Sequence, residues 1–298
     1  MTRKSKLLRY NHDLIKNVLQ FKPTSLVIAK GVEIFPETLK IISEELPDIL
    51  IININHDDYF SRAPGNRFTD LEASIPHYHY FFPTKKINVA ELRERGAQEV
   101  HYLPFGYDSS LYIPIQPTRE EYDRYRSDLV FIGNYETERA RQMEVIADLS
   151  LSIWGRGWNK WQIPAVLRRC YRKPDCLSNP EMDFPKVVNS SSISLNFFRK
   201  ENRDTLNPRA FELPACGAFV LSQRSEELME YFDEGREIVT FASREELQAK
   251  ARYYLSHDRE REKIAAAGLK KVIAGGHTIL KRVKALLEIC AGRAGVIV

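Results

Sequence analysis

The sequence lacks long hydrophobic runs, clustered cysteines, internal repeats and low-complexity segments. No apolar stretch approaches the roughly 18 residues that a membrane-spanning helix needs, which excludes a helical membrane protein. Its four cysteines, none spaced like metal ligands, are Cys170, Cys176, Cys216 and Cys290. That spacing predicts no metal site. Because no secretory signal is recognisable, we expect reduced thiols and a cytoplasmic location.

Blocks of one charge sign are also missing, since acidic and basic residues are interleaved. The chain of 298 residues has 44 Lys and Arg against 40 Asp and Glu, a net charge of +4. No basic stripe stands out, so we expect no nucleic-acid partner. The small positive excess suits an anionic substrate or loose peripheral contact with an anionic membrane. Hydrophobic residues at 43% predict a globular protein with a sizeable core.

Strand and helix patterns alternate in the first part of the chain. An amphipathic helix is expected before Pro23. Apolar, β-branched runs predict strands at 25–29, 48–55, 78–83 and 99–104. Helical spacing predicts helices at 38–46 and 88–95. This alternation is typical of a parallel sheet with helices on both faces.

A second run of alternating elements follows a segment rich in proline, glycine and charge. In that segment, 107–126, we expect a linker without helix, because proline interrupts helices and strand ladders. Strands are then expected at 128–132, 151–154, 192–197, 218–221 and 237–241, with helices from 245 to 290. The sequence thus predicts an N-terminal domain at 1–106 and a C-terminal domain at 127–298, with tail helices packing across the domain junction.

The most informative stretch runs from 195 to 223 and predicts strand, polar loop, short helix and strand. Asn207 and Pro208 suit a helix start, and Gly217 suits a left-handed helix end. Asp204 precedes the helix and Glu212 lies about one turn inside it. A helix start binds phosphate, and carboxylates accept hydrogen bonds from sugar hydroxyls. We therefore expect a nucleotide-sugar site.

The same residues allow a purely structural interpretation. In it, Glu212 pairs with Arg209 on a buried crossover helix, and Asp204 makes a loop turn. In the first interpretation Arg209 instead balances diphosphate charge with its planar fork of donors. The residues alone favour neither.

Glycines also stand at two other strand ends. Gly133 and Asn134 follow strand 128–132, with Arg139 nearby, and Gly155 and Arg156 follow strand 151–154. Glycine lets the backbone approach a phosphate closely. The alternative for Arg139 is a solvated position on a helix face.

The N-terminal part offers one polar cluster at a strand end, His56, Asp57 and Asp58. Open parallel sheets place ligands at such ends, so His56 and Asp57 are candidates for acceptor or sugar contacts and for a general base. A polar turn capped by Asp57 or Asp58 is the alternative, which the local pattern slightly favours.

The stretch 195–223 resembles the Glu-x7-Glu element of GT-B glycosyltransferases, with Asp204 in place of the first Glu. The continuation at 226–268 and 277–289 is similar to the CgeB-like (spore maturation protein) branch of the group 1 glycosyltransferases. Tyr-Leu-Pro-Phe-Gly-Tyr-Asp at 102–108 resembles that family's interdomain connection. Since aspartate is one methylene shorter than glutamate, Asp204 has less reach than the family residue.

The resemblance implies an α/β protein of GT-B fold, two Rossmann-like parallel-sheet domains facing a cleft. A complete GT-B N-terminal domain opens with a strand and a glycine-rich turn, so we expect this one either to be naturally short or to lack its first βα unit. The implied enzyme is a hexosyltransferase-type glycosyltransferase that moves a sugar from a nucleoside diphosphate to an acceptor hydroxyl. The acceptor class is a glycan, a lipid-linked group or a protein. Retention of configuration is implied, with no metal and no cofactor.

The resemblance also implies roles for individual residues. Glu212 would hold the ribose hydroxyls, Asp204 the sugar ring, and three arginines the diphosphate: Arg139, Arg156 and Arg209. The other expected donor contacts are Gly133, Asn134, Gly155, Asn196 and Asn207. A donor phosphate oxygen is the expected base, with His56 or Asp57 as alternatives.

Two rival functions fit the same sequence. One is a GT-B-shaped nucleotide-sugar epimerase, which needs no acceptor. The other is a non-catalytic coat or assembly protein that keeps the fold without turnover, favoured by the short N-terminal half and by Asp204. We expect a cytoplasmic location, with the inner face of the membrane as an alternative.

Overall fold

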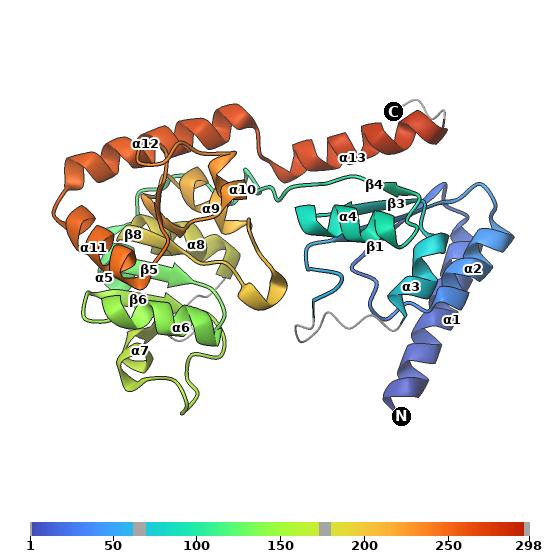
Figure 1. The fold of residues 1–298 in the computed structure, drawn as a ribbon, viewed down its shortest axis with the longest axis horizontal. Helices are drawn as coiled ribbons and strands as arrows, with labels where there is room; N and C mark the ends of the chain where they lie inside the picture. Colours follow the sequence, from blue (N-terminus) through green and yellow to red (C-terminus); the bar gives the residue numbers. More distant parts are fainter. Residues whose placement is uncertain (1, 62–69, 173–179, 295–298) are drawn as a thin grey trace. The chain divides into compact units, whose positions relative to one another are not determined.

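The computed structural model describes residues 2–61, 70–172 and 180–294, and Cys176 lies outside them. The chain forms two compact units (Figure 1). The first unit comprises Met1–Pro104, Glu201–Arg203 and Val283–Val298, and the second comprises Phe105–Lys200 and Asp204–Arg282. Each unit has its own parallel sheet, so the predicted α/β class with two sheets is confirmed.

The sheet of the first unit has its strands in sequence order. They are β1 (Ser25–Ala29), β2 (Leu50–Asn55), β3 (Tyr80–Pro83) and β4 (Glu99–Val100), all parallel. Strand β4 is shorter than the expected 99–104. Hydrogen bonds nevertheless continue beside β3, because the N–H groups of His101 and Leu103 donate to the carbonyls of Phe81 and Pro83 at 3.0 and 2.9 Å.

Helices cover both faces of this first sheet. They are α1 (Arg3–Phe21), α2 (Pro36–Glu45), α3 (Leu71–Ser74), η1 (Ile75–His77), α4 (Lys86–Glu94) and α13 (Ile279–Ala294). Ile51 and Phe81 face a core shared with α1, α2 and α4. Ile52 and Phe82 point to the other face, where Leu286 of α13 packs against them. Alternate residues of a strand point to opposite faces, so apolar runs give this sheet two cores.

The sheet of the second unit has the order β10-β9-β8-β5-β6-β7, with every pair parallel. The strands are β5 (Ser127–Ile132), β6 (Leu151–Trp154), β7 (Tyr171–Arg172), β8 (Ser191–Asn196), β9 (Val220–Gln223) and β10 (Val239–Phe241). After β7 the chain returns to the other side of β5 and continues outward from there. The switch point of the topology therefore lies between β5 and β8, where sheets of this type bind ligands.

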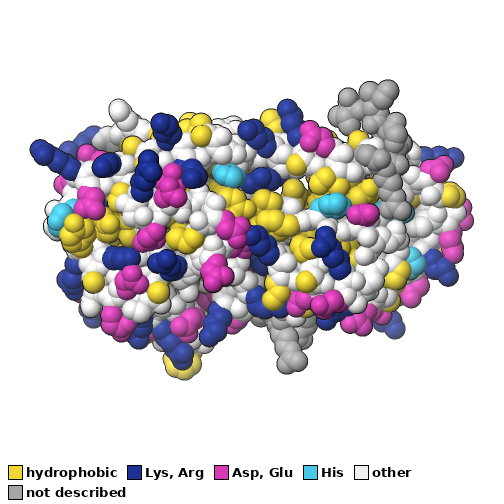
Figure 2. Space-filling model, turned by 45° about the horizontal axis from the view of Figure 1, so that its top comes forward, with side chains coloured by type: hydrophobic (Ala, Val, Ile, Leu, Met, Phe, Trp, Pro, Cys, Tyr) yellow, Lys and Arg dark blue, Asp and Glu magenta, His cyan; other side chains and the backbone are white. Residues whose placement is uncertain are grey.

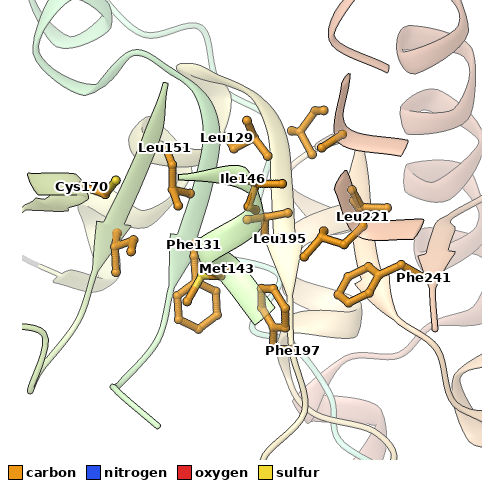
Figure 3. Packing of buried hydrophobic residues seen from close by; sticks show 14 of the residues in the cluster. Leu129, Phe131, Met143, Ile146, Leu151, Cys170, Leu195, Phe197, Leu221 and Phe241 are labelled. Atoms are coloured by element: carbon orange, nitrogen blue, oxygen red, sulfur yellow. The ribbon is translucent and has the colours of Figure 1, made fainter. Parts of the chain in front are cut away.

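Helices also surround the second sheet. They are α5 (Arg119–Tyr125), α6 (Thr137–Met143), η2 (Glu144–Ile146), α7 (Ala165–Cys170), α8 (Pro180–Asn189), α9 (Arg209–Ala215), α10 (Glu226–Met229), α11 (Arg244–Leu255) and α12 (Asp258–Gly275). The short helix η4 (Lys200–Asn202) belongs mostly to the first unit. Figure 3 shows one core of this unit, built from side chains of successive strands. Phe131 and Phe197 meet edge to face at 5.5 Å, and Phe197 meets Phe241 at 5.3 Å. The strands on either side of the switch point are thus joined by aromatic packing.

One sequence prediction about the fold was wrong. The segment 107–126 was expected to lack helix, but its last part forms α5. Thr118 and Glu121 make a capping box, in which the N–H of Thr118 donates to Glu121 at 2.9 Å and the N–H of Glu121 donates to Thr118 at 3.3 Å. Because the prolines of the segment precede this cap, they do not interrupt the helix.

Candidate functional site

The candidate site lies at the carboxyl ends of β5, β6 and β8, around the switch point of the second sheet. The turns after β5 and β6 are joined to each other by two hydrogen bonds. The N–H of Arg156 donates to the side-chain oxygen of Asn134 at 3.1 Å, and the N–H of Tyr135 donates to the carbonyl of Arg156 at 2.9 Å. These bonds fix the relative position of both turns.

Gly155 allows this close approach. Its φ is +145°, and a Cβ at this position would overlap the carbonyl oxygen of Gly133. The same carbonyl accepts a hydrogen bond from the indole Nε1 of Trp158 at 2.8 Å. Trp158 is fully buried, so the glycine turns rest on a packed aromatic side chain. The main chain at 133–134 and 155–156 therefore forms a preorganised part of the site.

Arg139 on α6 contacts the chain just after both strands of the switch point, β5 and β8. Its side chain is buried, and it donates to the carbonyls of Asn134 and Phe197 at 3.2 Å each. Burial lowers the pKa of this guanidinium, while the charges of Glu136 and Asp204 oppose that shift. The alternative of a solvated helix-face arginine is therefore wrong. Arg139 ties the end of β5 to the end of β8.

Two buried amides fasten the start of α9. Asn207 donates to the side-chain oxygen of Asn196 at 2.9 Å and to the carbonyl of Phe197 at 3.1 Å. Its own oxygen accepts the N–H of Ala210 at 3.3 Å. Asn196 in turn donates to Ser222 of β9 at 3.1 Å. Both amides, which the sequence predicts as donor contacts, are thus engaged within the protein, where they position α9 at the sheet.

Arg209 and Glu212 form an ion pair on α9. The Nε of Arg209 also donates to the carbonyl of Ile132 at 3.3 Å, and its guanidinium lies 4.5 Å from the ring centroid of Phe184. The Arg209 side chain keeps 30% of its surface exposed, against 9% for that of Glu212. This pairing is the one expected from the structural interpretation, and it leaves Arg209 accessible to an anion.

Tyr112 completes this group and was missed in the sequence. Burial, followed by the charge of Glu212, raises the pKa of Tyr112 to about 12, while the charge of Arg209 opposes this shift. Its ring meets Phe184 edge to face at 5.1 Å. The residue belongs to the segment expected to be a linker, so no local pattern marked it. We call Tyr112, Arg209 and Glu212 the α9 cluster.

Asp204 closes a turn in the loop that precedes α9. Its N–H donates to the carbonyl of Arg199 at 3.0 Å, and its carboxylate accepts the N–H of Arg199 at 3.2 Å. The Arg199 side chain donates to Glu136 at 2.6 Å. The loop turn expected in the structural interpretation is therefore present, and the charge of Asp204 opposes the lowering of the pKa of Arg139.

His56 and Asp57 lie in the first unit, just after β2. Asp57 pairs with Lys30 at 2.5 Å, and its N–H donates to Asn55 at 3.0 Å. Neighbouring protein displaces water around His56, and this lowers its pKa even though part of its surface is exposed. A neutral imidazole can accept a proton. Asp57 is held in a polar turn, as the alternative interpretation expected.

Asp58, the next residue in the chain, has a structural role, and the sequence did not predict its partners. It is fully buried and accepts hydrogen bonds from Arg203 at 2.7 Å, Asn88 at 2.8 Å and the N–H of Phe60 at 3.0 Å. Burial raises its pKa, but the hydrogen bonds outweigh that effect and lower it. Arg203 also donates to Glu91 twice, at 2.8 Å each.

A family model described as "Glycosyl transferase-like" matches residues 137–288. That range is just over half of the chain and contains α6, β6, β8, α9 and β9 of the candidate site. The chain belongs to this glycosyl transferase-like family. Membership confirms the predicted resemblance to group 1 glycosyltransferases, because it covers the stretch on which that resemblance rests.

A relative of this glycosyl transferase-like chain confirms the predicted branch. Spore protein CgeB of Bacillus subtilis (strain 168) is 24% identical over 193 residues. The match covers 58% of the chain and 59% of CgeB. The chain therefore spans about three fifths of the length of this relative.

Solved structures confirm the GT-B fold of this family member. HepE of Anabaena, solved in a complex with UDP, has a TM-score of 0.63 and 11% identity. The match covers 95% of this chain and 82% of the HepE chain. Sucrose-phosphate synthase from Thermosynechococcus elongatus matches 98% of the chain and 80% of its own, with a TM-score of 0.65 and 11% identity. At these identities the likeness concerns the fold.

The part of this glycosyl transferase-like chain that the structure describes contains neither a metal-binding group nor a membrane-spanning helix. Within residues 2–61, 70–172 and 180–294, His, Cys, Asp and Glu form no group of three or more that would hold a metal ion. In the same part of the chain, no helix has the length and apolarity to cross a bilayer. That the reaction needs neither metal nor cofactor stays a prediction.

Proposed function

We propose that this chain transfers a sugar from a nucleoside diphosphate to an acceptor hydroxyl, with retention of configuration and without a metal. The observation that carries the proposal is the α9 cluster beside two joined glycine turns at the switch point. Family membership supports sugar transfer. Two solved structures of one protein with this fold, HepE with UDP and HepE with UDP-glucose, favour a uridine nucleotide as the first donor to test.

The chemistry of such a transfer depends on the leaving group. An oxocarbenium-like transition state leaves negative charge on the departing diphosphate, and preorganised donors that stabilise this charge lower the barrier. Arg209 is partly exposed and Arg156 is exposed, so both are available to oxygen atoms of a diphosphate. Arg139 is buried, and its role is to hold the site together. A donor phosphate oxygen acts as base, with His56 or Asp57 as alternatives.

Glu212 is assigned to the ribose hydroxyls. A carboxylate has two oxygens with about four lone-pair sites, and Arg209 and Tyr112 occupy part of this capacity. The remaining capacity accepts hydrogen bonds from two vicinal hydroxyls. Asp204 is assigned to the sugar ring, where its short side chain favours direct contact with a hydroxyl close to the loop.

A binding screen tests the proposal most directly. We expect the melting temperature of the full chain to rise with one nucleotide among UDP, GDP, ADP and CMP, and with its sugar conjugates, because ligand binding stabilises the folded state. The sugar conjugate that binds should then release its nucleoside diphosphate when an acceptor hydroxyl is supplied. Absence of a shift with every nucleotide would rule out the proposed donor site.

A non-catalytic assembly function is the second candidate. Glu212 is already paired with Arg209, and Asp204 already closes a loop turn, so both acids have structural roles without a ligand. Nucleotide binding without turnover on any glycan, lipid-linked or protein acceptor would favour this candidate. Conversion of the donor sugar without an acceptor would instead identify an epimerase. Peripheral contact with the cytoplasmic face of a membrane stays a proposal, which vesicle flotation tests.

A further inference from the structure

The second unit has a groove of about 550 Å³ between one face of α12 and the loop at 235–237. Lys263, Ala267, Lys270 and Ala274 line one side of it. They recur at steps of three and four residues, which places them on one face of the helix. Figure 1 shows α12 as a long helix along the outside of this unit. The groove volume lies within the roughly 300–1,000 Å³ of pockets that bind small organic ligands.

The groove lies at the opposite edge of the sheet from the candidate site. Residues 235–237 precede β10 and therefore stand at its amino end. The strands are all parallel, so the candidate site, at their carboxyl ends, shares no lining residue with the groove. A ligand here would not use the α9 cluster.

The walls of the groove are fixed by internal contacts. The loop is closed by the N–H of Gly235, which donates to the carbonyl of Ile238 at 2.8 Å, and by the N–H of Asp233, which donates to Glu237 at 2.8 Å. Gly268 lets α12 pack against this loop, since a Cβ there would lie 2.5 Å from the carbonyl oxygen of Glu237. The groove is thus formed before any ligand arrives, which reduces the ordering cost of binding.

Some of the charged side chains that line the groove are paired with other residues, and some are not. Four basic and two acidic side chains line it, a net charge of +2. Glu237 pairs with Lys271 at 3.1 Å, and Glu260 accepts a hydrogen bond from Tyr253 at 3.0 Å. Among the described residues, Lys263 and Lys270 have neither an ion pair nor a side-chain hydrogen bond. Figure 2 shows dark-blue Lys and Arg side chains interspersed with magenta Asp and Glu on the visible face.

We propose that this groove binds a small phosphorylated ligand. A phosphate monoester carries a charge of about −1.5 to −2 at pH 7, which matches the net charge of the groove. Lys263 and Lys270 are seven residues apart, about 10 Å along the helix, so they bracket a phosphate or diphosphate from both ends. Ile264 and Ala267 offer an apolar surface between them for the uncharged part of the ligand.

Titration calorimetry with inorganic pyrophosphate tests the proposal on the full chain. The groove variant is Lys263→Gln with Lys270→Gln, which removes two charges from exposed helix positions. Lys4→Gln with Lys6→Gln removes the same charge from exposed positions on α1. Arg209→Gln identifies any pyrophosphate bound at the candidate site, where Arg209 is itself a proposed diphosphate contact. We expect the dissociation constant of the groove site to rise at least tenfold in the groove variant and to stay within twofold in the Lys4/Lys6 control.

A second arm distinguishes the source of the phosphate. Phosphatidylcholine vesicles containing phosphatidic acid present the same monoester as a lipid headgroup. Cosedimentation that the groove variant loses, without pyrophosphate binding, identifies a headgroup; pyrophosphate binding without cosedimentation identifies a free phosphate compound. The proposal is overturned if neither probe binds, if the groove variant binds as the unmodified chain does, or if only Arg209→Gln loses binding.

Discussion

Arg209 and Glu212 form an ion pair across one turn of α9, and the Nε of Arg209 also donates to the carbonyl oxygen of Ile132 at 3.3 Å. The pair therefore connects a helix that carries a proposed donor residue with the end of the central strand β5. Any ligand that binds Glu212 does so in the presence of an arginine already in place. This arrangement favours an anionic ligand with hydroxyl groups close to its charge.

Removal of the Glu212 carboxylate should weaken nucleotide binding. We expect Glu212→Ala to raise the dissociation constant for the nucleotide found in the screen more than tenfold, about 1.4 kcal/mol. The reason is the loss of the acceptor for the ribose hydroxyls and of the partner of Arg209. Calorimetry measures it, with exposed Glu226→Ala on α10 as the control. An unchanged affinity in Glu212→Ala would remove this residue from the site.

Tyr112 should act by positioning Glu212. Tyr112→Phe keeps the edge-to-face contact with Phe184 and removes only the hydroxyl, which is close enough to Glu212 for the carboxylate charge to raise the pKa of Tyr112. A polar group that orients a carboxylate contributes about as much as a hydrogen bond to a charged group, about 1.5–3 kcal/mol. We therefore expect nucleotide affinity to fall by about tenfold or more. A substitution that leaves affinity intact and lowers only the melting temperature would show that Tyr112 merely supports packing.

Gly155 should tolerate no side chain. We expect Gly155→Ala to destabilise the second unit by about 2–3 kcal/mol, because it combines an unfavourable φ with overlap against Gly133. Urea unfolding followed by tryptophan fluorescence reports on this unit, since Trp154, Trp158 and Trp161 all belong to it. Gly235→Ala is the matched control: its φ is +71° and no atom lies within 4 Å of the added Cβ. Equal losses in both variants would contradict the overlap.

His277 should make stability depend on pH. Burial, followed by the charges of Arg282 and two lysines, lowers its pKa to about 4, and Arg282 donates to its Nδ1 at 2.9 Å. In the unfolded chain the pKa of this histidine is about 6.5, so between pH 6.5 and pH 4 it binds a proton that it does not bind in the folded chain. Stability should therefore fall as pH falls from 6.5 towards 4, by about 1–2 kcal/mol at pH 5. Urea unfolding measures the free energy of unfolding at pH 7 and at pH 5. We expect this free energy to differ less between the two pH values in His277→Gln than in the unmodified chain. Equal differences in both proteins would contradict this role of His277.

Arg203 should stabilise the first unit through Asp58. Arg203→Ala leaves a fully buried carboxylate without its main partner, a change that costs about 3–5 kcal/mol. Urea unfolding followed by circular dichroism measures the loss. Arg9→Ala, which breaks an exposed pair with Asp13 at 3.7 Å, should change stability by less than about 1 kcal/mol. Similar small losses in both variants would mean that water reaches Asp58.

The sequence by itself determined the two sheets, the positions of their strands and the family. Strands β1, β5, β6 and β8 lie within one or two residues of the apolar runs that predicted them. Such runs are local, and burial on both faces of a parallel sheet leaves few other conformations for them. Gly217 likewise has the left-handed φ of +74° that its place after a helix predicted.

Only the tertiary structure decided which polar side chains meet. The sequence left Arg139 and Glu212 between two interpretations, gave no sign of Tyr112 or Arg203, and did not predict α5. The partners of these residues come from distant segments: Phe197 for Arg139, and Asp58 for Arg203. Burial and pairing of a charge depend on which strands become neighbours, and that order is set by the packing of the whole sheet rather than by any local pattern.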